Sequence, residues 1–147
     1  PIALSARMTL NAIDGMMARE HGQASRLGAL LNELGDMASD AALYLPFALV
    51  PGLSPVLVVL AVVAALMTEG AGLAALLVGA GRRYDGPLGK SDRAVAFSLL
   101  AVLLGLGLGT DRLFSILLLV IIALAVWTIV NRVRAALAHQ ADKPTAS

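Results

Sequence analysis

Residues 113–130 read LFSILLLVIIALAVWTIV, and this stretch decides the class of fold because only Ser115 and Thr128 interrupt its apolar side chains. A helix crosses the hydrocarbon core of a bilayer with roughly 20 mostly apolar residues, a length that this stretch reaches with its flanks. Residues 54–67 and 94–109 have a similar composition. The whole chain is 59% hydrophobic and 14% charged, whereas soluble domains carry about a quarter charged residues. We therefore predict an integral membrane protein made of helices, since no alternating strand pattern is present.

Five hydrophobic segments are expected along the chain, at residues 2–19, 26–50, 54–80, 94–109 and 112–137. The short connections between them favour antiparallel neighbours in one bundle. We thus predict an all-α, polytopic transmembrane helix bundle, with one membrane-embedded domain over residues 1–137 and a flexible cytoplasmic tail over residues 138–147. Because Pro1 opens the chain within an apolar pattern, we also expect an N-terminal truncation.

Basic residues gather at connections that fall on one side of the membrane if each segment crosses it once. They are Arg19, Arg26, Arg82, Arg83, Lys90, Arg93, Arg132, Arg134 and Lys143, and only Arg112 lies opposite. The positive-inside rule makes that side cytoplasmic and predicts a location in a bacterial inner membrane. The net charge of +1 does not favour nucleic-acid binding, and the absence of cysteine excludes disulfides and thiol catalysis.

Two stripes of polar and small side chains are expected on the first two segments. At about 100° per residue, one stripe holds Arg7, Asn11, Asp14 and Ala18, and the other holds Gly28, Asn32, Asp36 and Asp40. Acidic side chains near hydrocarbon are unfavourable and usually mark an ion or substrate site. If the stripes face each other, oxygen ligands converge from two helices, and such ligands suit a hard cation such as Mg²⁺, Mn²⁺ or Ca²⁺.

The run Asp14-Gly15-Met16-Met17-Ala18-Arg19, followed at fixed spacings by Gly28, Asn32 and Asp36, resembles a known signature. This is the signature of the CDP-alcohol phosphotransferase family, D-x2-D-G-x2-A-R-x8-G-x3-D-x3-D, and its spacing matches throughout. The resemblance implies a six-helix membrane enzyme, of which this chain supplies the last five helices. It also implies that an acceptor hydroxyl displaces CMP from a CDP-linked lipid or alcohol, with two divalent ions held by four aspartates.

The chain departs from that signature at two of the four aspartate positions, where Asn11 and Asn32 stand instead. An amide oxygen still ligates a hard cation but offsets none of its charge. Two adjacent dications are therefore expected to bind weakly, or one of the two sites to be lost. Asp40 and Glu33 lie near the second stripe and are candidates to compensate.

The resemblance implies a role for each matching position. Asp36 is the expected general base and, with Asp14, Asn11 and Asn32, an expected ligand of Mg²⁺ or Mn²⁺. Asp40, which lies outside the signature but near the stripe, is added to this expected ligand set. Residues expected to border the nucleotide or its phosphates are Gly15, Ala18, Arg19, Arg26 and Gly28, together with Lys90 and Arg93 of the loop GPLGKSDR. The expected reaction transfers a phosphatidyl or substituted phosphoryl group from CDP-diacylglycerol to an alcohol in phospholipid biosynthesis.

Other interpretations of the same residues stay open. The acidic pattern also suits a buried polar network, and the two asparagines also suit a catalytically degenerate relative that binds lipid or nucleotide or serves a structural role. A transporter is less favoured because the last two segments carry few polar residues. Asp40 is as readily a hydrogen-bond partner between helices, and Glu69 either pairs with another helix or lines a cavity. Glu33 is expected to be solvated or to face lipid headgroups, Arg132 and Arg134 to be positive-inside anchors, and small-residue faces permit a homodimer.

Overall fold

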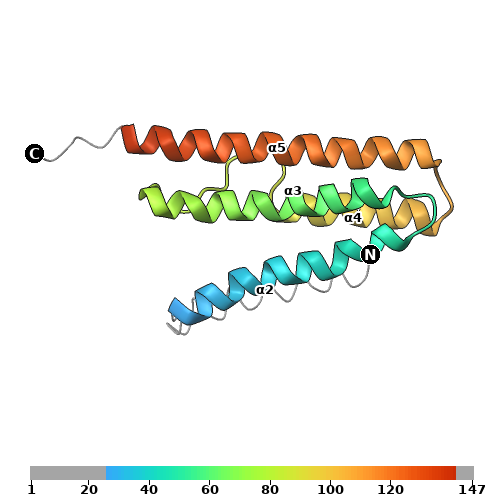
Figure 1. Cartoon of the computed structure of the whole chain (residues 1–147), viewed down its shortest axis with the longest axis horizontal. Coiled ribbons are helices and arrows are strands. Elements are labelled where there is room, and N and C mark those ends of the chain that lie inside the picture. The colour runs from blue at the N-terminus through green and yellow to red at the C-terminus, as the bar shows by residue number, and fades with distance from the viewer. Residues whose placement is uncertain (1–25, 142–147) are drawn as a thin grey trace, which may run out of the picture.

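The computed structural model describes residues 26–141, and every element in this range is helical. The elements are α2 (Arg26–Tyr44), the short 3-10 helix η1 (Leu45–Leu49), α3 (Pro55–Ala74), the 3-10 helix η2 (Ala75–Val78), α4 (Lys90–Gly105) and α5 (Asp111–Ala141) (Figure 1). The all-α fold class is confirmed for this part of the chain. The first expected segment, residues 2–19, lies outside the described residues, as does the tail beyond residue 141.

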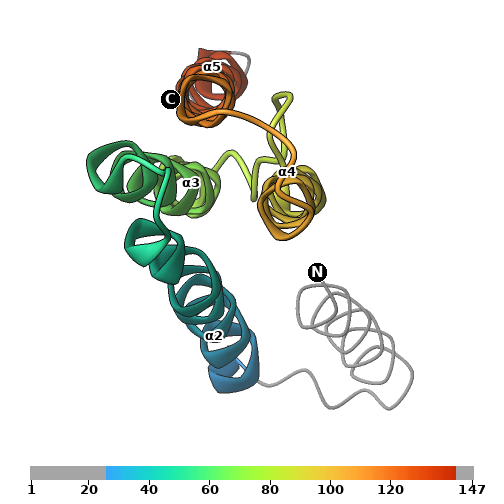
Figure 2. The same ribbon diagram turned by 90° about the vertical axis from the view of Figure 1, so that its right-hand side faces the viewer.

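Helix α3 occupies the middle of the bundle, packing against α5 along much of its length and against α2 and η1 on another side. The view along the helices in Figure 2 shows α3 between α5 and α2, with α4 on its remaining flank. Consecutive helices run in opposite directions (Figure 1). The N-terminal part of α2, the C-terminal part of α3, the start of α4 and the end of α5 therefore lie toward the same end of the bundle.

Local sequence explains where the helices begin and end. Pro46 has no backbone N–H and cannot continue the α-helical bonds of α2, so a 3-10 turn follows Tyr44. Helix α4 begins at Lys90, four residues before the predicted start, because the Asp92 carboxylate accepts a hydrogen bond from the backbone N–H of Gly89 at 2.8 Å. It ends at Gly105 rather than at residue 109, and the chain then turns through Gly107 at a φ of +64°.

An apolar core joins α2, α3, α4 and α5. Tyr44 stacks on Phe97 with ring centroids 4.0 Å apart, and Val58 and Leu118 are fully buried beside them. Many other large apolar side chains point outward, among them Val59 and Val63 on α3 and Leu119 and Trp127 on α5. Such an exposed apolar surface suits contact with lipid rather than with water.

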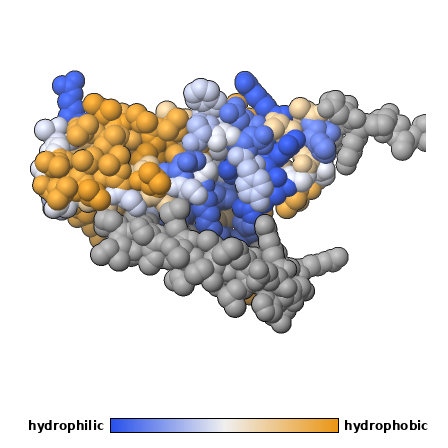
Figure 3. All heavy atoms as spheres, turned by 180° about the vertical axis from the view of Figure 1, so that it is seen from behind, coloured by the Kyte–Doolittle hydropathy of each residue, from blue (hydrophilic) through white to orange (hydrophobic). Residues whose placement is uncertain are grey.

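Two of the described helical stretches are long and apolar enough to cross a membrane, residues Pro55–Val78 and Asp111–His139. Helix α4, with 16 residues, spans only roughly 24 Å and so falls short of the hydrocarbon core. Figure 3 shows apolar side chains gathered over one end of the bundle and hydrophilic side chains toward its middle and other end. The polar side chains that matter for function lie in this hydrophilic part.

Candidate active site

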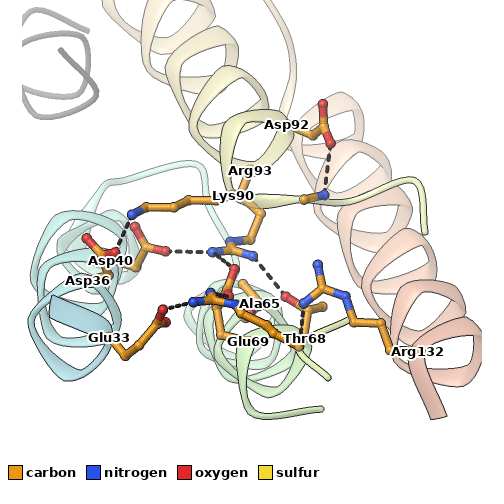
Figure 4. Close-up of polar contacts among 12 residues, drawn as sticks. Glu33, Asp36, Asp40, Ala65, Thr68, Glu69, Lys90, Asp92, Arg93 and Arg132 are labelled. Atoms are coloured by element: carbon orange, nitrogen blue, oxygen red, sulfur yellow. Dashed lines mark hydrogen bonds and ion pairs between the residues drawn. The ribbon is translucent and has the colours of Figure 1, made fainter. Parts of the chain in front are cut away.

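Four carboxylates and three cationic side chains from three helices and one connection meet in the hydrophilic part of the bundle (Figure 4). They are Glu33, Asp36 and Asp40 on α2, Glu69 on α3, Arg82 in the segment of residues 79–89, and Lys90 and Arg93 on α4. We call these seven residues the charged cluster and residues 79–89 the α3–α4 link. The cluster joins elements that are distant in the sequence.

Arg93 lies at the centre of the charged cluster, and its side chain is 1% exposed. Its Nη2 atom lies 2.8 Å from Glu69 Oε1 and 3.0 Å from Asp40 Oδ2, and its Nη1 donates to Thr68 Oγ1 at 2.9 Å. The guanidinium thus holds side chains of α2 and α3 from the first turn of α4 (Figure 4). A buried charge persists only where such partners satisfy it. Arg93 was expected in a loop, and the structure places it in a helix instead.

Arg82 connects the α3–α4 link to the same carboxylates. Its Nη2 lies 3.1 Å from Glu69 Oε2, and its Nη1 forms an ion pair with Glu33. The expectation that Glu33 is solvated or faces lipid headgroups is wrong, because this pairing turns it into the bundle. Of the two interpretations of Glu69, the structure favours pairing with another part of the bundle.

Asn32, Asp36 and Asp40 follow one another at one-turn spacing on α2, as the stripe predicts. The Asn32 amide donates to Asp36 Oδ2 at 3.5 Å, and the Lys90 ammonium forms an ion pair with the same oxygen. Exposure falls along the stripe: Asn32 is exposed, the Asp36 side chain is 13% exposed and Asp40 is 2% exposed. Asp36 is therefore the carboxylate of this stripe that an incoming molecule reaches most easily.

Hydrogen bonds from α5 fix the α3–α4 link. Arg132 donates to the backbone carbonyl of Thr68 on α3 and, at 3.3 Å, to that of Asp85. Thr128 Oγ1 accepts the backbone N–H of Leu88 at 2.9 Å. Arg132 is 2% exposed, so the expectation that it is a positive-inside anchor is wrong. No local sequence pattern could reveal that Arg132 binds the α3–α4 link, because Thr68 and Asp85 are distant from Arg132 in the sequence.

Gly86 lies where the α3–α4 link packs against Thr128 of α5. Its φ is +121°, and a Cβ atom there would lie 2.7 Å from Thr128 Cα. Only glycine permits this backbone conformation so close to α5. The link therefore carries Arg82 and delivers Lys90 in one fixed arrangement.

Several expected site residues lie outside the structural description. They are Asn11, Asp14, Gly15, Ala18 and Arg19. Arg26 is the first residue of α2, and Gly28 is exposed on the same helix. The structure brings together Asn32, Asp36 and Lys90. Asp40 and Arg93 pair with each other further inside the bundle, where both side chains are buried.

The oxygen donors of residues 26–141 do not by themselves complete a metal site. No group of three His, Cys, Asp or Glu side chains within residues 26–141 could hold a metal ion. Asn32 offers a neutral amide oxygen and Asp36 a carboxylate, while the Asp40 carboxylate pairs with Arg93. These are ligand types that Mg²⁺ and Mn²⁺ accept. The charge that a pair of dications requires is not present among these residues.

The arrangement suits chemistry on a phosphate ester. A partly exposed carboxylate can accept the proton of a hydroxyl group. An ammonium beside it can contact phosphate oxygens, for which charged donors form the strongest hydrogen bonds. Both groups lie in the bundle that also exposes large apolar side chains, an arrangement that suits a substrate with a lipid part and a water-soluble part.

Comparison with known proteins agrees with this geometry. The family model for CDP-alcohol phosphatidyltransferase matches residues 2–140. The chain is also 44% identical over 142 residues to "Inner membrane protein YnbA" of Escherichia coli (strain K12), an alignment that covers 97% of this chain and 71% of that protein. No solved structure matches the chain significantly. Because the family model covers nearly the whole sequence, the chain belongs to the CDP-alcohol phosphatidyltransferase family.

Proposed function

We propose that this protein transfers a phosphatidyl group from CDP-diacylglycerol to an alcohol acceptor and releases CMP. Family membership supports the coarser statement, transfer of a phosphoryl group from a CDP-linked alcohol. The observation that carries the proposal is the position of Asp36, the last residue of the signature, which faces Lys90 across the gap between α2 and α4 (Figure 4). A lipid donor suits the exposed apolar side chains of the bundle, among them Leu31 and Leu34 on α2, the helix that carries Asp36.

Asp36 serves as the general base in this proposal. The acceptor oxygen attacks the phosphorus that carries the diacylglycerol group, and its proton passes to the Asp36 carboxylate. A new oxygen–phosphorus bond forms while the bond to the bridging oxygen breaks, so that CMP leaves with that oxygen. Lys90 contributes positive charge where the diphosphate lies.

The family is generally dependent on a divalent metal, and Mg²⁺ or Mn²⁺ is the cofactor proposed here. Asn32 and Asp36 would hold the ion from α2, together with the expected ligands Asn11 and Asp14. When bound, the ion neutralises the diphosphate and stabilises the leaving CMP. The contacts of Asp40 favour the role of a partner between helices over that of a metal ligand, since its carboxylate is buried against Arg93.

The orientation of the site follows from charge. The cations Arg82, Arg83, Lys90, Arg93 and Arg132 lie in the α3–α4 link, the first turn of α4 and the C-terminal half of α5, and Arg112 lies in the first turn of α5, at the opposite end of the bundle. The matched relative is named as an inner membrane protein. We therefore place the chain in a bacterial inner membrane with the charged cluster facing the cytoplasm.

The test is CMP release from labelled CDP-diacylglycerol by the purified full-length protein in lipid nanodiscs, with Mg²⁺ or Mn²⁺ and a panel of acceptors. Glycerol phosphate, inositol phosphate and serine belong in that panel because one signature serves many acceptors. Asp36→Asn should lower the rate at least about a hundredfold. Asp111→Asn is the control, since Asp111 is an exposed carboxylate at the opposite end of the bundle.

Two results would contradict the proposal. One is wild-type activity in Asp36→Asn. The other is binding of CDP-diacylglycerol by the wild-type protein without release of CMP in the presence of any acceptor, which would favour the degenerate relative that Asn11 and Asn32 suggest.

A further inference from the structure

Thr128 of α5 holds the α3–α4 link directly before α4 begins. Its hydroxyl donates to the backbone carbonyl of Leu124 at 2.8 Å, and its Oγ1 lone pairs accept the backbone N–H of Leu88 at 2.9 Å. Thr128 is fully buried and Leu88 is 2% exposed. Lys90, the first residue of α4, follows Leu88 after a single intervening residue. This hydrogen bond therefore sets where the backbone enters the helix that carries Lys90.

The close packing of Thr128 on the link adds a steric restraint to the hydrogen bond. A Cβ atom on Gly86 would lie 2.7 Å from both Cα and Cγ2 of Thr128, so the backbone of the link lies directly against α5. Arg132 holds the link at Asp85, further from Lys90 along the chain. Thr128 thus controls the part of the link that leads into α4.

The other end of the segment that contains Lys90 is held by Arg93, whose guanidinium is buried in the charged cluster. Between these two attachments, the Gly89 carbonyl accepts the backbone N–H of Arg93 at 3.1 Å. The backbone of Lys90 is therefore positioned from α5 on one side and from α2 and α3 on the other. From this position the Lys90 ammonium forms its ion pair with Asp36.

The Lys90 ammonium depends on its backbone for its position. Its side chain is 37% exposed, and a four-carbon stem carries the charge, so packing around the side chain fixes it only in part. In catalysis by positioned groups, a misplacement of about 1 Å lowers a rate by up to about a hundredfold. Helix α5 contributes none of the seven residues of the charged cluster, yet it holds the backbone from which Lys90 reaches Asp36.

We propose that Thr128 is a positioning residue, which acts through the Leu88 N–H to hold the Lys90 ammonium beside Asp36. Its effect on the rate of transfer rests on the proposed function, whereas its effect on the contact between Lys90 and Asp36 does not. The hydroxyl group carries this role. Thr128→Val keeps the shape of the side chain and removes the acceptor, so it should loosen the contact. Thr128→Ser keeps the acceptor and should preserve it.

The first experiment measures the contact between Lys90 and Asp36 without any substrate. A water-soluble carbodiimide activates a carboxylate, and an adjacent amine then displaces the urea and forms an amide, so the reagent joins only groups in contact. The purified full-length protein in nanodiscs is treated and digested, and mass spectrometry quantifies the peptide that links the two residues.

The yield of this cross-link should fall about fivefold in Thr128→Val, the change in population that corresponds to the loss of one hydrogen bond. Thr128→Ser should stay near the wild type. Thr128→Ala is a second variant without the hydroxyl, in case Thr128→Val does not fold, and it should also lower the yield. Ser115→Ala is the matched control, because the Ser115 hydroxyl donates within α5 to the carbonyl of Asp111 at 2.9 Å.

The rate of CMP release then separates positioning of Lys90 from a general structural role. Thr128→Val should lower kcat about tenfold, and Thr128→Ser should restore most of this loss. In a Lys90→Met background, Thr128→Val should change kcat by less than about twofold, because the group on which Thr128 acts is already absent. A structural role would instead multiply the two losses.

An unchanged cross-link yield in both Thr128→Val and Thr128→Ala would overturn the inference, as would multiplied losses of kcat in the double variant. The proposed function is tested separately. If the cross-link yields are as expected but no acceptor yields CMP, the transferase proposal fails and Thr128 still sets the position of Lys90. If CMP is released but the cross-link is unchanged, the reverse holds.

Discussion

Replacing Arg93 with methionine should destabilise the bundle more than any change at its apolar surface. Methionine fills a similar volume without charge, so the variant removes the ion pairs to Glu69 at 2.8 Å and to Asp40 at 3.0 Å and the hydrogen bond to Thr68 at 2.9 Å. The two carboxylates are 6% and 2% exposed and would remain buried. Glu69 keeps its ion pair with Arg82 at 3.1 Å, whereas Asp40 loses its ion pair with Arg93.

The magnitude follows from those contacts. Removing one partner of a buried ion pair costs about 3–5 kcal/mol, mainly because the other charge is left uncompensated. Arg93 contacts two carboxylates, but Glu69 keeps its second ion pair, with Arg82 at 3.1 Å, so the loss should lie within that range rather than above it. For a chain of this size, roughly 3 °C of melting temperature corresponds to each kcal/mol, so the midpoint should fall by about 9–15 °C. Without Arg93 the charged cluster has four carboxylates and two cations, so adding Glu69→Gln to Arg93→Met should restore part of this loss by lowering the excess of negative charge from two to one.

Thermal unfolding of the protein in detergent, followed by size-exclusion chromatography after heating, measures the effect. Arg134→Met provides the matched control, because it removes an exposed arginine from α5 and should leave the midpoint unchanged. A midpoint for Arg93→Met within about 2 °C of the wild type would refute the reasoning. So would a further decrease, rather than a recovery, on adding Glu69→Gln.

Three further changes test how the α3–α4 link is held. Gly86→Ala should lower the free energy of unfolding by about 2–4 kcal/mol, because the new Cβ would lie 2.7 Å from α5 at a φ of +121°; Gly70→Ala, with open space around its Cα, is the control in the same melting assay. Thr128→Val should cost about 1–3 kcal/mol by leaving the Leu88 N–H without its acceptor, and Thr128→Ser should cost much less. Arg132→Met should detach the link from α5, so limited proteolysis should cut the link faster than in the wild type; equal cleavage rates would contradict this.

The sequence was sufficient for those parts of the site that depend on a single helix. Asn32, Asp36 and Asp40 recur every four residues, and four residues are close to one helical turn. Their position on one face of α2 therefore needed only the correct assignment of a helix. The same holds for the apolar segments that became α3 and α5, because length and composition alone identify a membrane-spanning helix.

The partners of that stripe could not be predicted in the same way. Arg93 and Asp40 are 53 residues apart, Lys90 and Asp36 are 54 apart, and Arg132 and Thr68 are 64 apart. Helical periodicity relates positions within a few turns and carries no information on which distant helix comes alongside. Arg132 resembled a surface anchor because basic residues near the end of a span usually are anchors. Its burial depends on where the α3–α4 link folds back.

The start of α4 is determined by a local hydrogen bond, and the hydropathy of the sequence does not reveal that bond. The segment was predicted to begin at its first long apolar run, at Ala94, whereas the helix begins with four polar or charged residues from Lys90 to Arg93. The Asp92 side chain accepts the Gly89 N–H and so starts the helix earlier. This one extra turn changes the chemistry, because it carries Lys90 and Arg93 on a rigid helix rather than on a loop.

The first turn of α4 carries both the buried cation Arg93 and the more exposed cation Lys90. Lys90 and Arg93 are three residues apart and therefore lie on neighbouring positions of one helix face. Arg93 points inward, where Asp40 and Glu69 hold it, and this fixes the rotation of α4 relative to α2. Once that rotation is fixed, Lys90 must lie one turn further out, beside Asp36. The buried ion pairs thus position the more exposed one, and a change at Arg93 should disturb the ion pair of Lys90 with Asp36, to which Arg93 does not belong.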